Sequence, residues 1–169
     1  VALSHRVNPE SREFERANTT VLSAAVMPLV ANYVDQLEER KPVQSRLHFF
    51  HSASGLCSSE IVRELPLTLA LSGPAAGVAA ASRVAQNLKI EQALTFDMGG
   101  TTTDVCMISH GSAEITADRS LAGQPLRMPA VAVESIGAGG GSLVRLDGGV
   151  LKVGPDSVGA DPGPAQPSA

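Results

Sequence analysis

Apolar residues recur at three- and four-residue steps in two parts of the chain, and this spacing predicts two helices. The first is expected over residues 18–41, where Pro28 predicts a kink or a restart. The second is expected over residues 72–88, because a serine, a glycine and a proline in its first turn are typical of a helix start. The apolar stripe predicted for the first helix consists of Leu22, Val26, Leu29, Tyr33 and Leu37.

Short apolar runs bounded by turn residues predict strands, so the chain as a whole is expected to be an α/β protein. A short strand is also expected at residues 1–4, a loop at 118–128, and a short helix at 58–65 with Ser58 or Ser59 as its cap. The main strands are expected at residues 47–50, 94–97, 103–108, 113–116, 131–136, 143–146 and 150–153, the last two joined by Asp147-Gly148-Gly149.

The segment between the strands at 94–97 and 103–108 is the most informative part of the chain. It reads Asp97-Met98-Gly99-Gly100-Thr101-Thr102-Thr103-Asp104. Glycines let a backbone approach an anion closely, and loop amides and threonine hydroxyls can donate to phosphate oxygens. An aspartate that ends a strand can hold Mg²⁺ through water. The segment therefore predicts half of a nucleotide-phosphate cradle, and the alternative is a hairpin whose glycines only satisfy backbone geometry.

Composition narrows the class of protein. A chain of 169 residues with 43% hydrophobic residues is long enough for one domain with a core. A net charge of -4 gives no basic surface for nucleic acid, and no apolar run is long enough to cross a bilayer. Cys57 and Cys106 lack metal-ligand spacing, and we expect both to be reduced core residues of a cytoplasmic protein.

Both ends of the chain look cut. The first residue is not Met, and the chain finishes in a Gly/Pro-rich tail over residues 154–169 that should lack regular structure. We therefore expect residues 1–169 to be a domain fragment of a longer protein, incomplete at both ends. The glycine-rich stretch at 137–142 leaves two interpretations open: it can bind an anion or a substrate, or it can be a linker between strands.

Four ordered motifs resemble those of the hydantoinase A / 5-oxoprolinase family, and together they cover nearly the whole chain. The segment from Phe96 to Val105 is similar to the second phosphate motif of that family. The other matching segments are 3–5 with 13–20 for the early signature, 71–78 for the helix before the phosphate loop, and 136–142 with 153–165 for the later signature. Asp156 and Asp161 match positions of the later signature, although a solvated loop explains them equally well.

This resemblance implies a segment of the actin-like ATPase (ribonuclease H-like) fold, with a mixed sheet and flanking helices. It implies a phosphate-binding hairpin over residues 94–108 and a glycine-rich loop and tail over 137–169. ATP and Mg²⁺ would be the cofactors, a small cyclic amide the substrate, and a hydantoinase B-type subunit or domain the partner. The function expected of the parent protein is ATP-dependent opening of a hydantoin or 5-oxoproline ring through phosphoryl activation.

Two other functions stay open. A related ATP-dependent ketone carboxylase would share the ATP site, and a non-catalytic fragment would explain why the first phosphate motif of the family is missing from these residues. The resemblance implies that Asp97 is the catalytic residue and holds the metal-bound water. The cofactor-binding residues it implies are Gly99, Gly100 and Thr101 around the β- and γ-phosphates, Thr102 and Thr103 as further donors, and Asp104, which orients the loop.

Overall fold

The computed structural model describes residues 1–121 and 123–159. The prediction for the end of the Gly/Pro-rich tail, including Asp161, lies outside these residues. Within the described tail, residues 154–157 belong to a strand, which the sequence analysis did not predict.

The chain divides into two compact units. One combines Val1–Ala80 with Glu114–Ala132, and the other combines Ala81–Ala113 with the segment from Val133 onward. Helix α4 (Ser72–Leu88) begins in the first unit and ends in the second, and its bounds are those predicted from the sequence.

The first unit is built around helix α2 (Glu13–Arg40). Its strands form two separate antiparallel pairs, β1 with β2 and β6 with β7. The remaining elements are α1 (Ser4–Val7), β1 (His48–His51), β2 (Gly55–Ser58), α3 (Ser59–Glu64), the 3₁₀ helix η1 (Pro66–Leu69), β6 (Ile115–Leu121) and β7 (Gln124–Val131).

Two apolar clusters hold α2 in the first unit. One is shared with β1, β2 and α3, and the other with η1 and β7, so each removes apolar surface of several elements from water. Burial in the first cluster raises the pKa of the Cys57 thiol, which disfavours the reactive thiolate. The first cluster consists of Val34, Phe49, Cys57 and Val62, and the second of Leu67, Leu126 and Met128 packed against Leu22 and Val26.

The buried face of α2 differs from the predicted stripe. Leu29 and Tyr33 are 72% and 51% exposed, whereas Thr19 and Ser23 are fully buried. The stripe was wrong at these positions because small hydroxyl side chains let a neighbouring strand approach a helix as closely as apolar ones do. A pattern counted in apolar residues alone does not detect such a face.

Helix α2 also continues without interruption through Pro28, where a kink or restart was predicted, and it begins at Glu13 rather than at residue 18. A proline inside a helix removes one backbone hydrogen bond. Pro28 is exposed, and the side chains of Val26 and Val30 on either side of it pack into the clusters of the first unit. Tertiary packing of this kind supplies most of the stability of a protein helix, so it offsets the local loss.

Thr19 joins α2 to β7. Its hydroxyl donates to the Glu15 carbonyl oxygen at 2.7 Å and accepts from the Arg127 amide at 3.0 Å. Nearby, the Asn18 side-chain amide donates to the Pro125 carbonyl oxygen at 2.6 Å. A buried hydroxyl that both donates and accepts leaves no polar atom of its own unpaired, which explains why a threonine is tolerated there.

Replacing Thr19 with valine should destabilise the fold by about 1–3 kcal/mol, because the Arg127 amide would lose its acceptor inside the protein. Thr20 provides the matched control, since its hydroxyl, among the residues that the structure describes, bonds only to the Arg16 carbonyl oxygen of its own helix. Thr20→Val should therefore change the midpoint of urea unfolding much less than Thr19→Val. Equal midpoints for the two variants would contradict the role given to Thr19.

The loop predicted at 118–128 is wrong, because these residues form most of the β6–β7 hairpin. The hairpin contains Gly123, Pro125 and Pro129, which are residues typical of turns and loops. In a two-stranded ribbon each strand has a free edge, so a proline there need not remove a ladder hydrogen bond. Gly123 adopts a positive φ of 77° at the turn, which suits a residue without a side chain.

Two short elements near the N-terminus also differ from expectation. The strand predicted at residues 1–4 is wrong, since a one-turn helix, α1, follows at Ser4–Val7. Ser58 is the residue before α3 as predicted, but it makes no side-chain cap hydrogen bond. Its hydroxyl instead bonds to the Glu60 carboxylate and, with the backbone of Glu60, lowers the pKa of that group. A strand at Gly55–Ser58 was not predicted at all.

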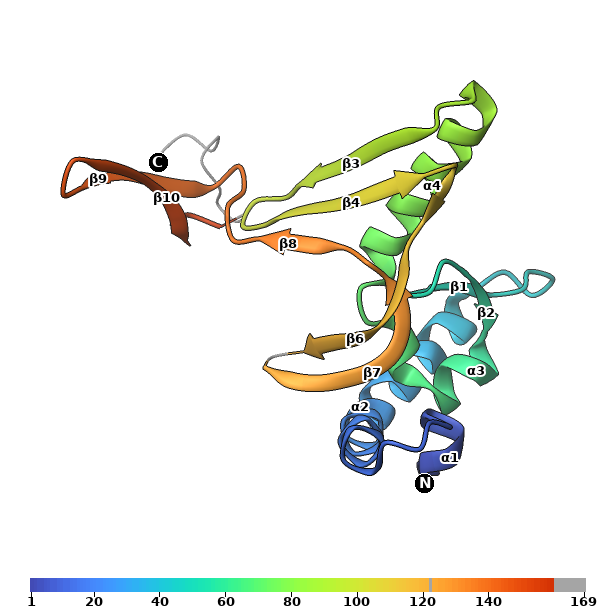
Figure 1. Ribbon diagram of the computed structural model, residues 1–169. Coiled ribbons are helices and arrows are strands. Elements are labelled where there is room, and N and C mark those ends of the chain that lie inside the picture. The colour runs from blue at the N-terminus through green and yellow to red at the C-terminus, as the bar shows by residue number, and fades with distance from the viewer. Residues whose placement is uncertain (122, 160–169) are drawn as a thin grey trace. The chain divides into compact units, whose positions relative to one another are not determined.

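The second unit contains a sheet centred on β4 (Thr103–Ser109). Strand β3 (Gln92–Met98) pairs with one edge of β4, and β5 (Ser112–Ala113) and β8 (Glu134–Ile136) pair with the other, all antiparallel (Figure 1). The strands predicted at 94–97 and 103–108 are thus confirmed. The strand predicted at 131–136 is interrupted, because Val131 still belongs to β7.

The last two strands, β9 (Ser142–Asp147) and β10 (Val150–Ser157), form the predicted hairpin (Figure 1). Gly148 and Gly149 make its two-residue turn with φ values of 57° and 85°, the conformation that favours glycine at both positions. One face holds two exposed apolar pairs, while charged side chains occupy the other. The apolar pairs are Val144 with Val153 and Leu146 with Leu151, and the ion pairs are Arg145 with Asp156 and Lys152 with Asp147.

Cys57 and Cys106 are both buried and form no disulfide with a described residue, in agreement with the prediction. Among the helices that the structure describes, none is both long and apolar enough to cross a membrane.

Candidate functional site: the 99–102 turn

The β3–β4 hairpin gathers the predicted phosphate-binding residues at one end of the sheet. Its register pairs Asp97 with Asp104 and leaves residues 99–102 as the turn between the strands. The Gly99 amide closes this turn by donating to the Thr102 carbonyl oxygen at 2.9 Å. The predicted arrangement of a strand, a tight turn and a second strand is confirmed.

Two carboxylates share one face of the hairpin beside this turn. Residues directly opposite one another in an antiparallel pair have Cα atoms about 4.5–5.5 Å apart and project to the same side, which places Asp97 next to Asp104. The Asp104 carboxylate accepts a hydrogen bond from the Ser135 hydroxyl at 2.5 Å. The exposed Asp97 carboxylate has no hydrogen-bond or ion-pair partner within residues 1–121 and 123–159. A cation would relieve the repulsion between these two like charges.

The threonines of the turn fall into two groups. Thr101 and Thr102 are exposed, so their hydroxyls are accessible to a ligand. Thr103 is only 3% exposed, and its hydroxyl donates to the Ala138 carbonyl oxygen at 2.6 Å. The Thr103 hydroxyl therefore anchors the 137–142 loop, and this residue can offer a ligand no free hydroxyl.

In the backbone of the turn, two carbonyl oxygens accept hydrogen bonds, whereas three amides do not donate to any described residue. The carbonyl oxygens of Gly99 and Gly100 both accept hydrogen bonds from amides of the 137–142 loop. The amides of Gly100, Thr101 and Thr102 have no acceptor among the described residues. Successive unpaired amides in a turn form a concave site for an anion, such as a phosphate group.

The 137–142 loop contacts the 99–102 turn directly. Gly140 and Gly141 donate to the turn at 2.9 and 2.7 Å, and the amides of Gly139 and Ser142 are bonded within the loop itself. These four amides are already engaged and cannot also bind an anion. The loop is also more than a linker, because it holds the backbone of the 99–102 turn.

A metal ion at this site would have few protein ligands. No group of three or more His, Cys, Asp or Glu side chains with the geometry to hold a metal occurs in the described part of the chain. Mg²⁺ at nucleotide sites commonly takes one or two carboxylates, because phosphate oxygens and water complete its octahedron. Asp97 and Asp104 supply oxygens of this kind, so the donor set fits Mg²⁺ that arrives with a nucleotide.

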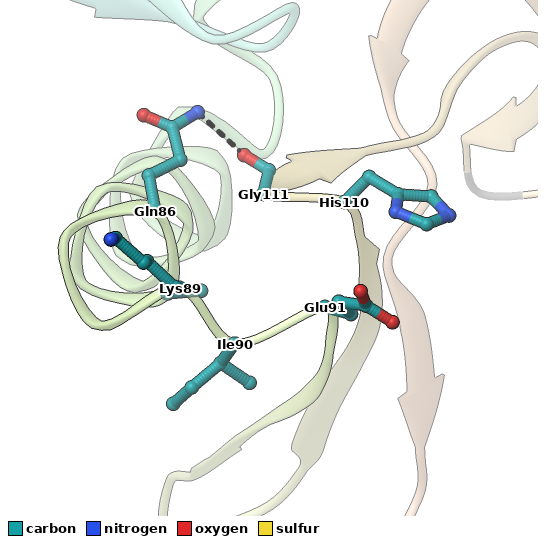
Figure 2. Close-up of a pocket in the computed structure, with 7 residues that line it drawn as sticks. Gln86, Lys89, Ile90, Glu91, His110 and Gly111 are labelled. Atoms are coloured by element: carbon teal, nitrogen blue, oxygen red, sulfur yellow. Dashed lines mark hydrogen bonds between the residues drawn. The ribbon is translucent and has the colours of Figure 1, made fainter.

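A separate pocket of about 370 Å³ lies at the opposite end of the β3 and β4 strands (Figure 2). Two strands of seven residues place it about 20 Å from the 99–102 turn. The Gln86 side-chain amide donates to the Gly111 carbonyl oxygen at 2.7 Å, which connects α4 to the turn after β4 (Figure 2). This pocket is lined by Ala85, Gln86, Lys89, Ile90, Glu91, His110 and Gly111, and none of these belongs to the predicted site.

All the residues predicted to form the site lie on the β3–β4 hairpin, whereas several residues that support it were not predicted. Ser135 bonds to Asp104, and the Ser157 hydroxyl donates to the Gly100 carbonyl oxygen at 3.3 Å. A single serine carries no recognisable signal in a sequence. The run of three glycines left binding and a linker as alternatives, and it did not indicate a contact with the 99–102 turn. The predicted residues that the hairpin brings together are Asp97, Gly99, Gly100, Thr101, Thr102, Thr103 and Asp104.

Comparison with known proteins finds one family and several relatives that match most of the chain. Residues 16–168 match the hydantoinase/oxoprolinase family. Caprolactamase subunit alpha of Pseudomonas jessenii is 36% identical over 168 residues, which cover 97% of this chain and 24% of that protein. The 5-oxoprolinase of Saccharomyces cerevisiae is 33% identical over 168 residues, which cover 98% of this chain and 13% of that protein. The chain thus spans about a quarter or less of the length of these relatives.

Two solved structures share the fold. The ATP-dependent caprolactamase from Pseudomonas jessenii is similar with a TM-score of 0.81 and 36% identity, over 95% of this chain and 24% of that one. The nucleotide-free structure of acetone carboxylase has a TM-score of 0.71 and 32% identity, over 92% of this chain and 22% of that one. These likenesses confirm the predicted class, an α/β segment of an ATPase fold. Because the family match extends from residue 16 to residue 168, the chain belongs to the hydantoinase/oxoprolinase family.

Proposed function

We propose that this chain carries the phosphate-binding hairpin of an ATP-dependent enzyme that opens a small cyclic amide of the hydantoin or 5-oxoproline type. The observation that carries the proposal is the hydrogen bonding of the 99–102 turn. Its carbonyl oxygens are bonded, whereas the amides of Gly100, Thr101 and Thr102 have no acceptor among the described residues and lie beside two carboxylates in register. Mg·ATP offers the complementary groups, namely phosphate oxygens for the amides and a cation for the carboxylates. The names of the relatives, caprolactamase and 5-oxoprolinase, support a cyclic amide as the substrate.

The chemistry needs ATP because resonance stabilises an amide. Transfer of the γ-phosphoryl group to the amide oxygen, with ADP leaving, turns that oxygen into part of a good leaving group. Water then adds to the carbonyl carbon, and the C–N bond breaks with release of the amine, which leaves an acyl phosphate. A second water hydrolyses this acyl phosphate to a carboxylate and free phosphate. Phosphoryl transfer of this kind depends on positioning and charge stabilisation more than on a strong protein nucleophile.

In this mechanism the residues of the hairpin have distinct roles. The Asp97 carboxylate would hold a metal-bound water, and the amides of Gly100 and Thr101 would donate to phosphate oxygens. The hydroxyl of Thr102 is a further donor. Asp104 orients the turn through its hydrogen bond to β8. Mg²⁺, when bound, neutralises negative charge on the phosphates.

A subunit of a ketone carboxylase is the second candidate, because acetone carboxylase has the same fold over this segment. The two activities would share the ATP site and differ in the substrate pocket. Since relatives are named as subunits, we propose a hydantoinase B-type subunit or domain as the partner. We also propose a reducing, cytoplasmic setting, which agrees with two buried cysteines that form no disulfide with a described residue.

The test uses the full-length protein together with its partner subunit. Incubation with Mg·ATP and hydantoin, 5-oxoproline or caprolactam should release ADP, phosphate and the ring-opened product without bicarbonate. ATP consumption that requires a ketone and bicarbonate would favour the carboxylase. If neither reaction consumes ATP and calorimetry detects no binding of Mg·ATP, the chain is not the phosphate-binding part of either enzyme.

A further inference from the structure

The geometry points to Gly139 and Gly141 as positioning residues that fix the direction of the amides in the 99–102 turn. The consequence for phosphate rests on the proposed function, whereas the contact between the two loops does not. The inference gives the 137–142 loop a task that neither its sequence nor the likeness to known enzymes assigns.

The first support is the absence of space for a side chain at these two glycines. A Cβ on Gly139 would lie 2.6 Å from the Gly99 carbonyl oxygen and 2.9 Å from the Thr101 nitrogen. A Cβ on Gly141 would lie 2.8 Å from the Gly159 carbonyl oxygen and 2.9 Å from the Gly100 carbonyl oxygen. The atoms around Gly139 belong to the backbone of the turn, and Gly141 lies between the turn and Gly159, so a residue other than glycine at either position has to displace backbone that it contacts.

The second support is the geometry of the peptide bond. The Gly99–Gly100 and Gly100–Thr101 peptides are trans, so each N–H points away from the C=O of the same peptide. Gly140 and Gly141 hold the two carbonyl oxygens by hydrogen bonds at 2.9 and 2.7 Å. Fixing these carbonyl groups toward the loop therefore directs the amides of Gly100 and Thr101 to the opposite side, where no described residue accepts from them.

The third support is that the loop is itself braced. The Thr103 hydroxyl donates to the Ala138 carbonyl oxygen at 2.6 Å, and the Val158 amide donates to the Gly141 carbonyl oxygen at 2.9 Å. The Ser157 hydroxyl reaches the Gly100 carbonyl oxygen at 3.3 Å from the same strand end. A loop that is tied at both ends can hold its neighbour in one position.

The glycines of the loop do not all have this role. A Cβ on Gly137 would meet no atom within 4 Å, and its φ is not in the left-handed region. At Gly140 the nearest atom would be the Gly99 carbonyl oxygen at 3.7 Å, an ordinary contact. Gly137→Ala is therefore the matched control for Gly139→Ala and Gly141→Ala, since it makes the same chemical change in the same loop.

The experiment compares these three variants in the full-length protein. Gly139→Ala and Gly141→Ala should each weaken Mg·ATP binding by about 10-fold or more, because two phosphate-facing amides are turned away, whereas Gly137→Ala should match the wild type. Calorimetry well below the melting temperature measures the affinity of the folded protein for Mg·ATP. If the two glycines served stability alone, the variants would have a lower melting temperature but an unchanged affinity for Mg·ATP. Hydrogen exchange of residues 97–104 should be faster only in Gly139→Ala and Gly141→Ala.

A further measurement on the unmodified protein covers the case in which both variants fail to fold. Without nucleotide, the amides of Gly140 and Gly141 should be protected from exchange, while those of Gly100 and Thr101 exchange freely. Mg·ATP should then protect Gly100 and Thr101. Rapid exchange at Gly140 and Gly141, or variants that all behave like Gly137→Ala, would overturn the inference. Protection at Gly140 and Gly141 with no affinity for Mg·ATP would support the contact between the loops and overturn the proposed function instead.

Discussion

Asp97→Asn should reduce the ATP turnover of the full-length protein by at least about 10²–10³-fold, the loss typical when a group that stabilises transition-state charge is removed. Asparagine keeps the size of the side chain but removes the negative charge that the proposed metal-bound water requires. The Asp97 side chain is exposed and makes no hydrogen bond or ion pair with a described residue, so the fold should survive the change. Release of ADP measures the turnover, and circular dichroism of the same samples measures the fold.

Glu134→Gln provides the control for this experiment. Glu134 is an exposed carboxylate of strand β8 in the same sheet, opposite Val105, and it has no proposed role. The same loss of charge at that position should leave turnover close to that of the wild type. Near-normal turnover of Asp97→Asn would remove Asp97 from the catalytic site.

Ile108→Ala should destabilise the protein by about 2–5 kcal/mol, which is a large part of the stability of a typical domain. Ile108 lies on the central strand β4 and is fully buried. Truncation would remove apolar contacts and leave a cavity that the surrounding strands can close only in part. The midpoint of urea unfolding, followed by circular dichroism, should fall accordingly.

The adjacent residue Met107 points to the other face of the same strand and is 59% exposed, so Met107→Ala should change stability by no more than about 0.5 kcal/mol. The two substituted residues are adjacent in the chain but differ in the burial of their side chains. If both substitutions lowered the unfolding midpoint equally, β4 would not have the buried face and the exposed face that the structure shows.

The sequence was sufficient where one short segment contained the whole local structure. The β3–β4 hairpin could be predicted because two apolar runs enclose a compact group of glycines, threonines and carboxylates. The β9–β10 hairpin could be predicted because Gly148 and Gly149 favour the turn that joins its strands. Helix α4 could be predicted from the residues of its first turn.

The sequence was insufficient where the structure depends on contacts between distant segments. Thr19 is not part of the apolar stripe predicted for α2, and its bond to the Arg127 amide of β7 explains why it is buried. The β6–β7 hairpin contains Pro125 and Pro129, and the sequence does not reveal that each of its strands has a free edge. For the candidate site, the partner of the glycine-rich loop could not be predicted, since about 40 residues separate it from the 99–102 turn.

The hydrogen bonds that fix the 99–102 turn are present before any ligand arrives. A segment that has to become ordered around its ligand loses conformational entropy at that moment, and this loss is subtracted from the affinity. Preorganisation removes most of that penalty for an anion that meets Gly100 and Thr101. Affinity at this end of the sheet is then governed by residues that never touch the ligand, and engineering it would begin in the 137–142 loop.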